Sequence, residues 1–485
     1  MKRTSMLNAM SLVSDQLITE SLTLFEMPAA EGNQRPKALS RFFNSGWGVA
    51  VICACVGLAV MAGILLAGQN PPDMPPAHSE QGSTESEETE DLIHTEVPTE
   101  RGTEAESDPY DPTEYTDGLT MTVINIGDDT IVEVLAYSGK KSHVVIPAEY
   151  RGHPVTTIGN SVFSPDSKTP NITSVYIPDS VTTICNRAFQ NCATLKELHL
   201  PASVSNIEEL AFWGCGNLEK ITVDEKNPYY HVSGNCLIET ATGKLILGCK
   251  DSVIPDDGSV KILGFGAFYN CYELTEITIP ESVTVMEDQC FYQCYALSRV
   301  EIKAPLTSLG ERAFYACDLT EIDLPDTLTT LSSYVFADCE KLRNIEIPSS
   351  VTEIHSYAFG ECMSLTEITI PSSVTGMGYE AFSYCGLTTA RVEANVTSLW
   401  CAFLSCENLK TIYLPASLTN IRDNDFFLCR NLSDIYFEGT CEQWRAIGGM
   451  DHYTASPQII IHCSNGDLTF VSDGSNSEPV DAHEN

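Results

Sequence analysis

Hydrophobic residues recur with a period of 23 residues along the C-terminal part of this 485-residue chain. Aligned segments share the template L-x-x-I-x-I-P-x-S-V-T-x-I-x-x-x-A-F-x-x-C. A unit of this length cannot bury its apolar side chains alone, so we predict that successive units stack into a solenoid with one shared core. The clearest signature, which we call the Phe–Cys ladder, is a phenylalanine followed three residues later by a cysteine. Its members are Phe189/Cys192, Phe212/Cys215, Phe268/Cys271, Phe291/Cys294, Phe314/Cys317, Phe336/Cys339, Phe359/Cys362, Phe382/Cys385, Phe403/Cys406 and Phe426/Cys429.

The template also predicts the elements within each unit. The I-x-I alternation indicates a short strand with both apolar side chains inward, ended by a proline that has no amide hydrogen to donate. Stacked units then form a parallel sheet. The V-T-x-I stretch supplies a second inward row, such as Val181 and Ile184, and A-F-x-x-C predicts a tight turn rather than a long helix. Cys215 and Cys271 lie 56 residues apart, so we predict an insertion between them.

The repeated cysteines have three interpretations. Metal binding commonly uses C-x-x-C pairs, which the sequence lacks. Disulfides between rungs fit the strand spacing of about 4.8 Å. Because every unit places a cysteine at the same position, we favour buried thiols that fill a small apolar slot. Cys441 and Cys463 lie outside the ladder, and with His452 and His462 they form a lesser candidate for a zinc site.

An uncharged stretch, WGVAVICACVGLAVMAGILLA, precedes the repeats and predicts a transmembrane helix at residues 47–68. A cleaved signal peptide is the alternative, since Ala67 and Gly68 are small. Arg101 is the only basic residue in the fifty that follow, whereas five basic residues precede the span. This asymmetry predicts a cytoplasmic segment at 1–46 and an extracellular repeat region. The five are Lys2, Arg3, Arg35, Lys37 and Arg41.

The segment between the predicted span and the repeats is rich in Pro, Ser, Thr and Glu. We predict an acidic disordered linker at 69–118, because like charges repel and almost no residue there can join a core. The solenoid is then expected at 119–463, followed by a C-terminal tail at 464–485.

The A-F-x-x-C and I-P-x-S-V-T-x-I motifs resemble the BspA-type leucine-rich repeat family across most of residues 120–463. VVIPAEYRGHPVTTIGNSVF is similar to the first unit of that family, and IYFEGTCEQWRAIGG with IHCSNGD is similar to its last. DEKNPYYHVSGNCLIETATGKLILGC resembles a variant repeat that carries a hairpin, which implies a hairpin insertion near 224–250. The resemblance also implies a cell-surface or secreted protein of a bacterium or protist, associated with adhesion and binding of host proteins or other cells.

The predicted fold class is therefore an α/β repeat. It is a leucine-rich-repeat solenoid with a parallel sheet on one face and short strands or helical turns on the other, preceded by one transmembrane helix.

Composition excludes several functions. With 66 acidic and 27 basic residues the formal charge is -39, so a nucleic-acid partner is not expected. The sequence contains no P-loop, no G-x-S-x-G and no H-E-x-x-H motif, and its ten histidines are scattered. We therefore predict no enzyme activity, no catalytic residue, no cofactor and no required metal.

The candidate binding residues are strand positions that face away from the core. The middle of this row is acidic, which suggests a negative surface for a basic protein segment, with tyrosines near both ends. A charged face that serves only solubility is the alternative. The predicted partner-binding residues are Tyr176, His199, Glu276, Glu301, Glu321, Asp323, Glu346, Glu367, Arg391, Tyr413 and Tyr436.

The predicted function is that of a membrane-anchored extracellular protein that binds a protein or glycan ligand, or mediates adhesion, through this sheet face. Two alternatives belong to other classes. One is an extracellular sensor coupled to the cytoplasmic segment, and the other is a passive structural protein of the cell surface.

Overall fold

The computed structural model describes most of the predicted repeat region. Residues Glu104–Asn485 form one compact unit. The predicted cytoplasmic segment, transmembrane helix and most of the linker lie outside the described residues. No helix in the described part of the chain has the length and hydropathy needed to cross a bilayer. The described residues are 115–126, 129–165, 171–422, 424–447, 458–471 and 480–481.

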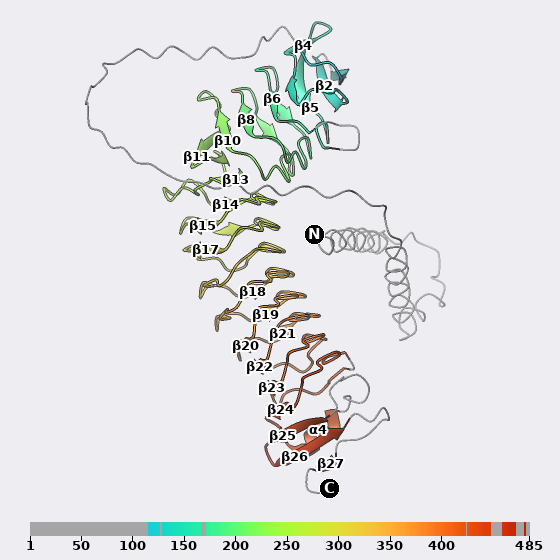
Figure 1. Ribbon diagram of the computed structural model, residues 1–485. Coiled ribbons are helices and arrows are strands. Elements are labelled where there is room, and N and C mark those ends of the chain that lie inside the picture. Colours follow the sequence, from blue (N-terminus) through green and yellow to red (C-terminus); the bar gives the residue numbers. More distant parts are fainter. Residues whose placement is uncertain are drawn as a thin grey trace, which may run out of the picture. The chain divides into compact units, whose positions relative to one another are not determined.

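The stack begins with a small mixed sheet, at the cyan end of the ribbon in Figure 1. β1 (Leu119–Ile126) pairs antiparallel with β2 (Asp129–Tyr137). β2 in turn pairs parallel with β5 (His153–Ile158), against which the short β4 (Glu149–Tyr150) folds back. β5 then begins the regular succession of rungs, which follow one another in chain order toward the red end of the ribbon (Figure 1).

The I-x-I segments form the predicted parallel sheet, because their alternating residues point inward and outward as a strand requires. β20 shows the alternation, with Ile368 and Ile370 buried and Glu367 and Thr369 exposed. The parallel pairing is interrupted between β6 and β8, between β10 and β15, and between β17 and β20. In the last of these breaks an isolated bridge joins Glu321 to Asn344. The strands are β3 (His143–Val145), β6 (Ser174–Tyr176), β8 (Glu197–Leu200), β10 (Lys220–Val223), β15 (Glu276–Ile279), β17 (Arg299–Ile302), β20 (Glu367–Ile370), β22 (Thr389–Val392), β23 (Thr411–Leu414), β24 (Asp434–Phe437) and β25 (Gln458–Cys463).

The V-T-x-I segments form the predicted second inward row, and they are also paired as two-residue parallel strands. Val181 and Ile184 are fully buried, as are Val351 and Ile354. The row therefore adds backbone hydrogen bonds to the apolar contacts that the sequence indicates. Its strands are β7 (Thr183–Ile184), β9 (Asn206–Ile207), β14 (Ile262–Leu263), β16 (Val285–Met286), β18 (Thr330–Leu331), β19 (Glu353–Ile354) and β21 (Gly376–Met377).

The A-F-x-x-C segments form turns, and the turns of neighbouring rungs are linked by their own hydrogen bonds. The amide of Phe359 donates to the carbonyl oxygen of Ala381 at 2.8 Å, and that of Glu361 donates to Ser383 at 2.8 Å. Backbone hydrogen bonds thus link rungs on three sides of the solenoid. The predicted α/β class was wrong, because the described repeats consist of strands and turns and form a β-solenoid. The one α-helix in the described residues is α4 (Cys441–Ile447), which follows the repeats.

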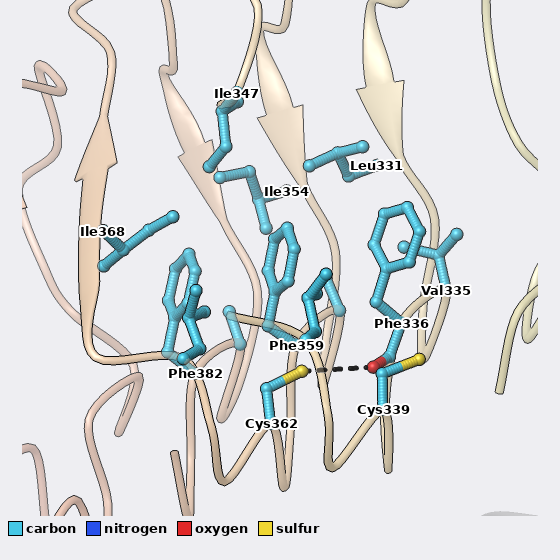
Figure 2. Close-up of a cluster of buried hydrophobic side chains, with 14 of the residues drawn as sticks. Leu331, Val335, Phe336, Cys339, Ile347, Ile354, Phe359, Cys362, Ile368 and Phe382 are labelled. Carbon is cyan, nitrogen blue, oxygen red and sulfur yellow. Dashed lines mark hydrogen bonds between the residues drawn. The ribbon is translucent and has the colours of Figure 1, made fainter. Parts of the chain in front are cut away.

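The Phe–Cys ladder occupies the interior, as predicted (Figure 2). The rings of Phe336, Phe359 and Phe382 stack with centroid separations of 5.5 and 5.1 Å. The thiol of Cys362 donates to the carbonyl oxygen of Phe336 at 3.2 Å, and most ladder cysteines repeat this bond. Burial raises the pKa of the Cys339 thiol to about 12. The described cysteines are free thiols, and those of the ladder are buried.

The insertion forms an antiparallel meander of β11 (Tyr230–Ser233), β12 (Cys236–Glu239) and β13 (Lys244–Leu247). β13 then pairs parallel with β14, so the meander joins the second row of short strands. Gly248 follows β13 beneath the Phe268 ring, where an added Cβ would lie 2.1 Å from a ring carbon. Glycine at this position leaves room for that phenylalanine.

The C-terminal end is closed by α4 and by a second antiparallel addition. β26 (Gly466–Val471) pairs with β25, and β27 (Val480–Asp481) pairs with β26. Trp444 of α4 packs edge-on against Phe437 at 5.3 Å. β26 lies in the segment predicted as a tail. Asn465-Gly466, between two runs of apolar residues, is a strong hairpin signal that the sequence analysis missed.

A half-buried carboxyl in the turn row predicts a pH-dependent stability. Burial, reinforced by the negative charges of Glu361 and Glu340, raises the pKa of Asp338 to about 7, against about 4 in an unfolded chain. The folded state holds this proton more tightly, so its contribution to stability is complete below pH 4 and is lost as pH rises through about 7. Asp338→Asn should therefore raise the free energy of unfolding at pH 8 by about 1–2 kcal/mol, a figure reduced for partial exposure.

Urea unfolding of the Asp338→Asn variant at pH 4 and pH 8 checks this prediction. Asparagine tolerates the positive φ at this position (62°), and any stability gained in this way is the same at both pH values. The difference between the effects of the substitution at pH 4 and pH 8 therefore reports the loss of the charge. Glu407→Gln, at an exposed position whose charge does not affect the pKa of Asp338, is the control. An equal effect of Asp338→Asn at both pH values would contradict the prediction.

Candidate functional site

The sheet face carries the predicted binding residues in register. Because neighbouring strands are parallel, outward residues at equivalent positions lie side by side: Thr278 is opposite Glu301, and Thr369 is opposite Arg391. The six predicted acidic residues are all exposed. The structure divides five of them between two grooves rather than one uniform row, and the sixth, Glu321, lines neither groove.

The larger groove, which we call the acidic groove, has a volume of about 680 Å³. Its rim carries Asp323, Glu346 and Glu367 from three consecutive rungs, together with Asp326, which the sequence analysis did not single out. The half-buried Leu324 forms part of the apolar floor. This groove coincides with the break in the parallel sheet between β17 and β20. The other lining residues are Ile322, Ile345, Ile347, Pro348, Ser349, Ile368, Thr369 and Pro371.

The smaller groove, of about 360 Å³, contains Glu276 and Glu301 but has mixed charge. Arg299 contributes to its wall. The Nζ atom of Lys303 lies 3.8 Å from one carboxylate oxygen of Glu301, and the other accepts a hydrogen bond from Thr278 at 3.2 Å. Basic side chains thus offset the negative charge that the sequence pattern suggested for this part of the face.

The aromatic residues near the C-terminal end form a closed stack. The Arg391 guanidinium lies 3.8 Å from the centre of the Tyr413 ring, Tyr413 stacks on Tyr436 at 4.8 Å, and Tyr436 stacks on His462 at 4.5 Å. The ring faces are therefore occupied by one another, and edges and hydroxyls are left for a ligand. His462 was not assigned to this row, although its position opposite Tyr436 continues the alternation.

The two carboxylates beside His462 complete this end of the face. Its ring nitrogens lie 3.0 Å from Asp467 and 3.2 Å from Asp434. Hydrogen bonds from Ser433 and His462 lower the pKa of Asp434. This end of the face therefore differs from the acidic groove, because Asp434 and Asp467 already have His462 as a hydrogen-bond partner.

The N-terminal members of the predicted row lie on earlier rungs. Tyr176 is half-buried in β6, and the exposed His199 of β8 shares a hydrogen bond of 2.9 Å with Thr222. The inserted meander follows them in the chain before the rungs of the acidic groove begin. The structure does not bring these two residues to that groove.

The lesser zinc candidate is not assembled. Cys463 and His462 are adjacent on β25, so their side chains point to opposite faces of the sheet. His452 lies outside the described residues. Within the described part of the chain, no group of three or more His, Cys, Asp or Glu side chains is placed to hold a metal ion.

Solved structures of three bacterial proteins resemble this chain. A leucine rich cell surface protein from Faecalibacterium prausnitzii A2-165 is 27% identical, with a TM-score of 0.42 over 70% of this chain and 98% of that one. A leucine-rich repeat protein from Bacteroides ovatus ATCC 8483 is 21% identical, with a TM-score of 0.41 over 73% and 91%. The pneumococcal vaccine antigen PcpA is 15% identical, with a TM-score of 0.41 over 73% and 98%.

The comparison with protein families addresses the repeats themselves. No curated protein matches the chain. The family model of the BspA type leucine rich repeat region matches six copies, at residues 156–236, 249–343 and 329–446. These ranges cover more than half of the sequence and include the acidic groove and the whole Phe–Cys ladder. The chain therefore belongs to the BspA-type leucine-rich repeat family.

Proposed function

We propose that this protein is anchored in the cell membrane by residues 47–68, with the solenoid outside the cell, and that it binds a basic protein segment in the acidic groove. The observation that carries the proposal is the groove itself. Three carboxylates from consecutive rungs surround an apolar floor in an open space of about 680 Å³. Family membership and the solenoid architecture support binding, since stacked repeats offer extended contact surfaces.

The chemistry of the groove favours lysine and arginine side chains. Their aliphatic stems can pack on Leu324 and the neighbouring isoleucines, while the charged groups meet the carboxylates on the rim. Within the described residues, no basic side chain forms an ion pair with Asp323, Glu346 or Glu367. A basic ligand would therefore meet negative charge that the protein itself leaves uncompensated.

Charge reversal tests the proposal. The probe is a fluorescent peptide with lysines at alternate positions. In an extended peptide such lysines lie about 6.6 Å apart on one face, whereas neighbouring rungs of the solenoid are about 4.8 Å apart. Asp323→Lys, Glu346→Lys and Glu367→Lys together, in the full chain kept in mild detergent, should weaken binding at least about tenfold. The wild-type affinity should fall as salt is raised, because exposed charges are screened.

The matched control makes the same change in net charge away from the groove. Glu340→Lys, Glu353→Lys and Glu407→Lys replace three exposed carboxylates that do not line it. This triple variant should bind within about twofold of the wild type. Equal losses in the two variants would show that net charge alone attracts the peptide. Unchanged binding in the groove variant, or no binding by the wild type, would refute the proposal.

A further inference from the structure

Cys441 and Cys463 differ from the ladder cysteines in their surroundings. A typical ladder thiol donates to the carbonyl oxygen of a phenylalanine on the preceding rung, as Cys385 does to Phe359 at 3.0 Å. Cys441 instead begins α4 and is 6% exposed, and Cys463 ends β25 and is half-buried.

The strand register places the two sulfurs on one face of the sheet. Cys463 is paired with Gly466 across the antiparallel β25–β26 hairpin, so a side chain at either position points to the same face. The Cys441 Sγ atom lies 3.7 Å from the position that a Cβ on Gly466 would occupy. Cys441 therefore lies over the Cys463–Gly466 pair, on the side that the Cys463 side chain occupies.

Backbone contacts hold the two segments together at this point. The Cys441 amide donates to Oδ1 of Asn465 at 2.8 Å, and the Ser464 amide donates to the carbonyl oxygen of Gly439 at 2.9 Å. The start of α4 is thus fixed against the turn that follows Cys463. Because both cysteines are already held close, joining them requires little rearrangement of the backbone.

We propose that Cys441 and Cys463 form a disulfide that clasps the C-terminal end of the solenoid. The inference rests on the proposed extracellular position, because disulfides persist in oxidising compartments. The bond would connect α4 to the β25–β26 hairpin across a sequence separation of 22 residues, from 441 to 463. It would fasten the last rung, which has no following rung to cover it.

The reaction requires an oxidant, for which we take a small disulfide such as oxidised glutathione. The more accessible Cys463 loses its proton to solvent, and its thiolate attacks one glutathione sulfur. The glutathione S–S bond breaks, leaving a mixed disulfide and one glutathione thiolate. The Cys441 thiolate, its proton also lost to solvent, then attacks the Cys463 sulfur and displaces the second glutathione thiolate. Two cysteine thiols are oxidised, one glutathione disulfide is reduced to two thiolates, and these take up two protons.

Burial and the neighbouring Cys441 raise the pKa of Cys463 to about 12, which keeps its thiolate fraction small. Exchange on the folded protein should therefore be slow, and long equilibration is needed. The ladder thiols are less accessible to an oxidant, because they are buried among the stacked phenylalanines. Oxidation is thus expected to select the half-buried C-terminal pair.

The experiment equilibrates the full chain, in mild detergent, with a glutathione mixture in which the oxidised form is in excess. Free thiols are then alkylated under denaturing conditions, and the protein is digested for mass spectrometry. The expected product is a peptide pair joined through Cys441 and Cys463, about 2 Da lighter than the sum of its parts. The other 17 of the 19 cysteines should be alkylated. Oxidation should also raise the melting temperature by roughly 4 °C.

Variants identify the bond. Cys441→Ser and Cys463→Ser should each abolish the joined peptide and the rise in melting temperature, whereas Cys185→Ser, at another half-buried cysteine, should change neither. Alkylation of both Cys441 and Cys463 in the wild type would overturn the inference, and so would joining of ladder cysteines in their place. The wild-type result stands even if a serine variant fails to fold.

The outcome is separable from that of the proposed function. Loss of the joined peptide with normal binding of the lysine peptide would refute only the disulfide. A joined peptide in a protein that does not bind the lysine peptide would refute only the acidic groove as its site.

Discussion

Replacing Phe359 with alanine is expected to lower the free energy of unfolding of the solenoid by about 4 kcal/mol. Phe359 is 0% exposed, and its ring is stacked between Phe336 at 5.5 Å and Phe382 at 5.1 Å (Figure 2). The neighbouring rungs are held by backbone hydrogen bonds, such as that from the Phe359 amide to Ala381, so they cannot easily close the cavity. The decrease in the free energy of unfolding thus has two parts, the lost burial of the ring and the cost of the cavity that it leaves.

Denaturant unfolding followed by circular dichroism measures this effect. Met363→Ala provides the control, because Met363 belongs to the same rung but is 55% exposed. That variant should stay within about 0.5 kcal/mol of the wild type. Similar losses for Phe359→Ala and Met363→Ala would contradict the placement of the Phe–Cys ladder in the core.

Substituting Gly386 with alanine is expected to destabilise the stack by at least about 2 kcal/mol. A Cβ at this position would lie 2.0 Å from the carbonyl oxygen of Met363 and 2.9 Å from its carbon. Both are backbone atoms of the preceding rung, so no side-chain rotation relieves the clash. The two rungs must separate, which weakens the bond from the Gly386 amide to the Cys362 carbonyl oxygen at 3.2 Å.

Gly376→Ala is the matched control for this substitution. The Cβ at Gly376 would approach the side chain of Glu353 no closer than 3.5 Å, which is an ordinary contact. The change should be neutral or slightly stabilising, because alanine reduces the freedom of the unfolded chain. Melting temperatures of the two variants provide the comparison. Equal melting temperatures would show that the rungs are not packed as closely at Gly386 as the structure indicates.

The repeat pattern was sufficient to predict the stack and its core. Each unit offers the same inward residues, and only stacking can cover them, so the burial of Phe336 or Cys362 follows from position in the template. The hydrogen bonds that link the turns could not be predicted in this way. They depend on residues held at positive φ, such as Glu361 at 65°, for which the sequence offers no consistent glycine.

The candidate site was predicted only in part. The outward strand positions are as expected, but the acidic groove depends on the break in the sheet around the isolated Glu321–Asn344 bridge and on the half-buried Leu324 and Ile345 beside it. Alternation does not indicate where a sheet is interrupted. The alternation also placed Glu301 in a continuous acidic row, although the ammonium group of Lys303, two residues further along the chain, lies 3.8 Å from its carboxylate.

Two features at the C-terminal end were missed for simpler reasons. His462 lies outside the I-x-I template, so it was considered as a metal ligand rather than as the next outward residue after Tyr436. The hairpin at Asn465-Gly466 follows the last recognisable repeat, so the 23-residue period gives no information about it. In both cases local strand and turn rules carry the information that the repeat does not.

Thiol labelling of the folded protein tests the continuous stacked core most directly. The full chain, reduced in mild detergent, is exposed to a maleimide, and each modified cysteine is identified by peptide mapping. If the rungs stack as described, the buried ladder cysteines should react at least about a hundredfold more slowly than in urea, and Cys463 should react first among the C-terminal cysteines. Labelling of Cys339, Cys362 and Cys385 in the native protein as fast as in urea would contradict the account.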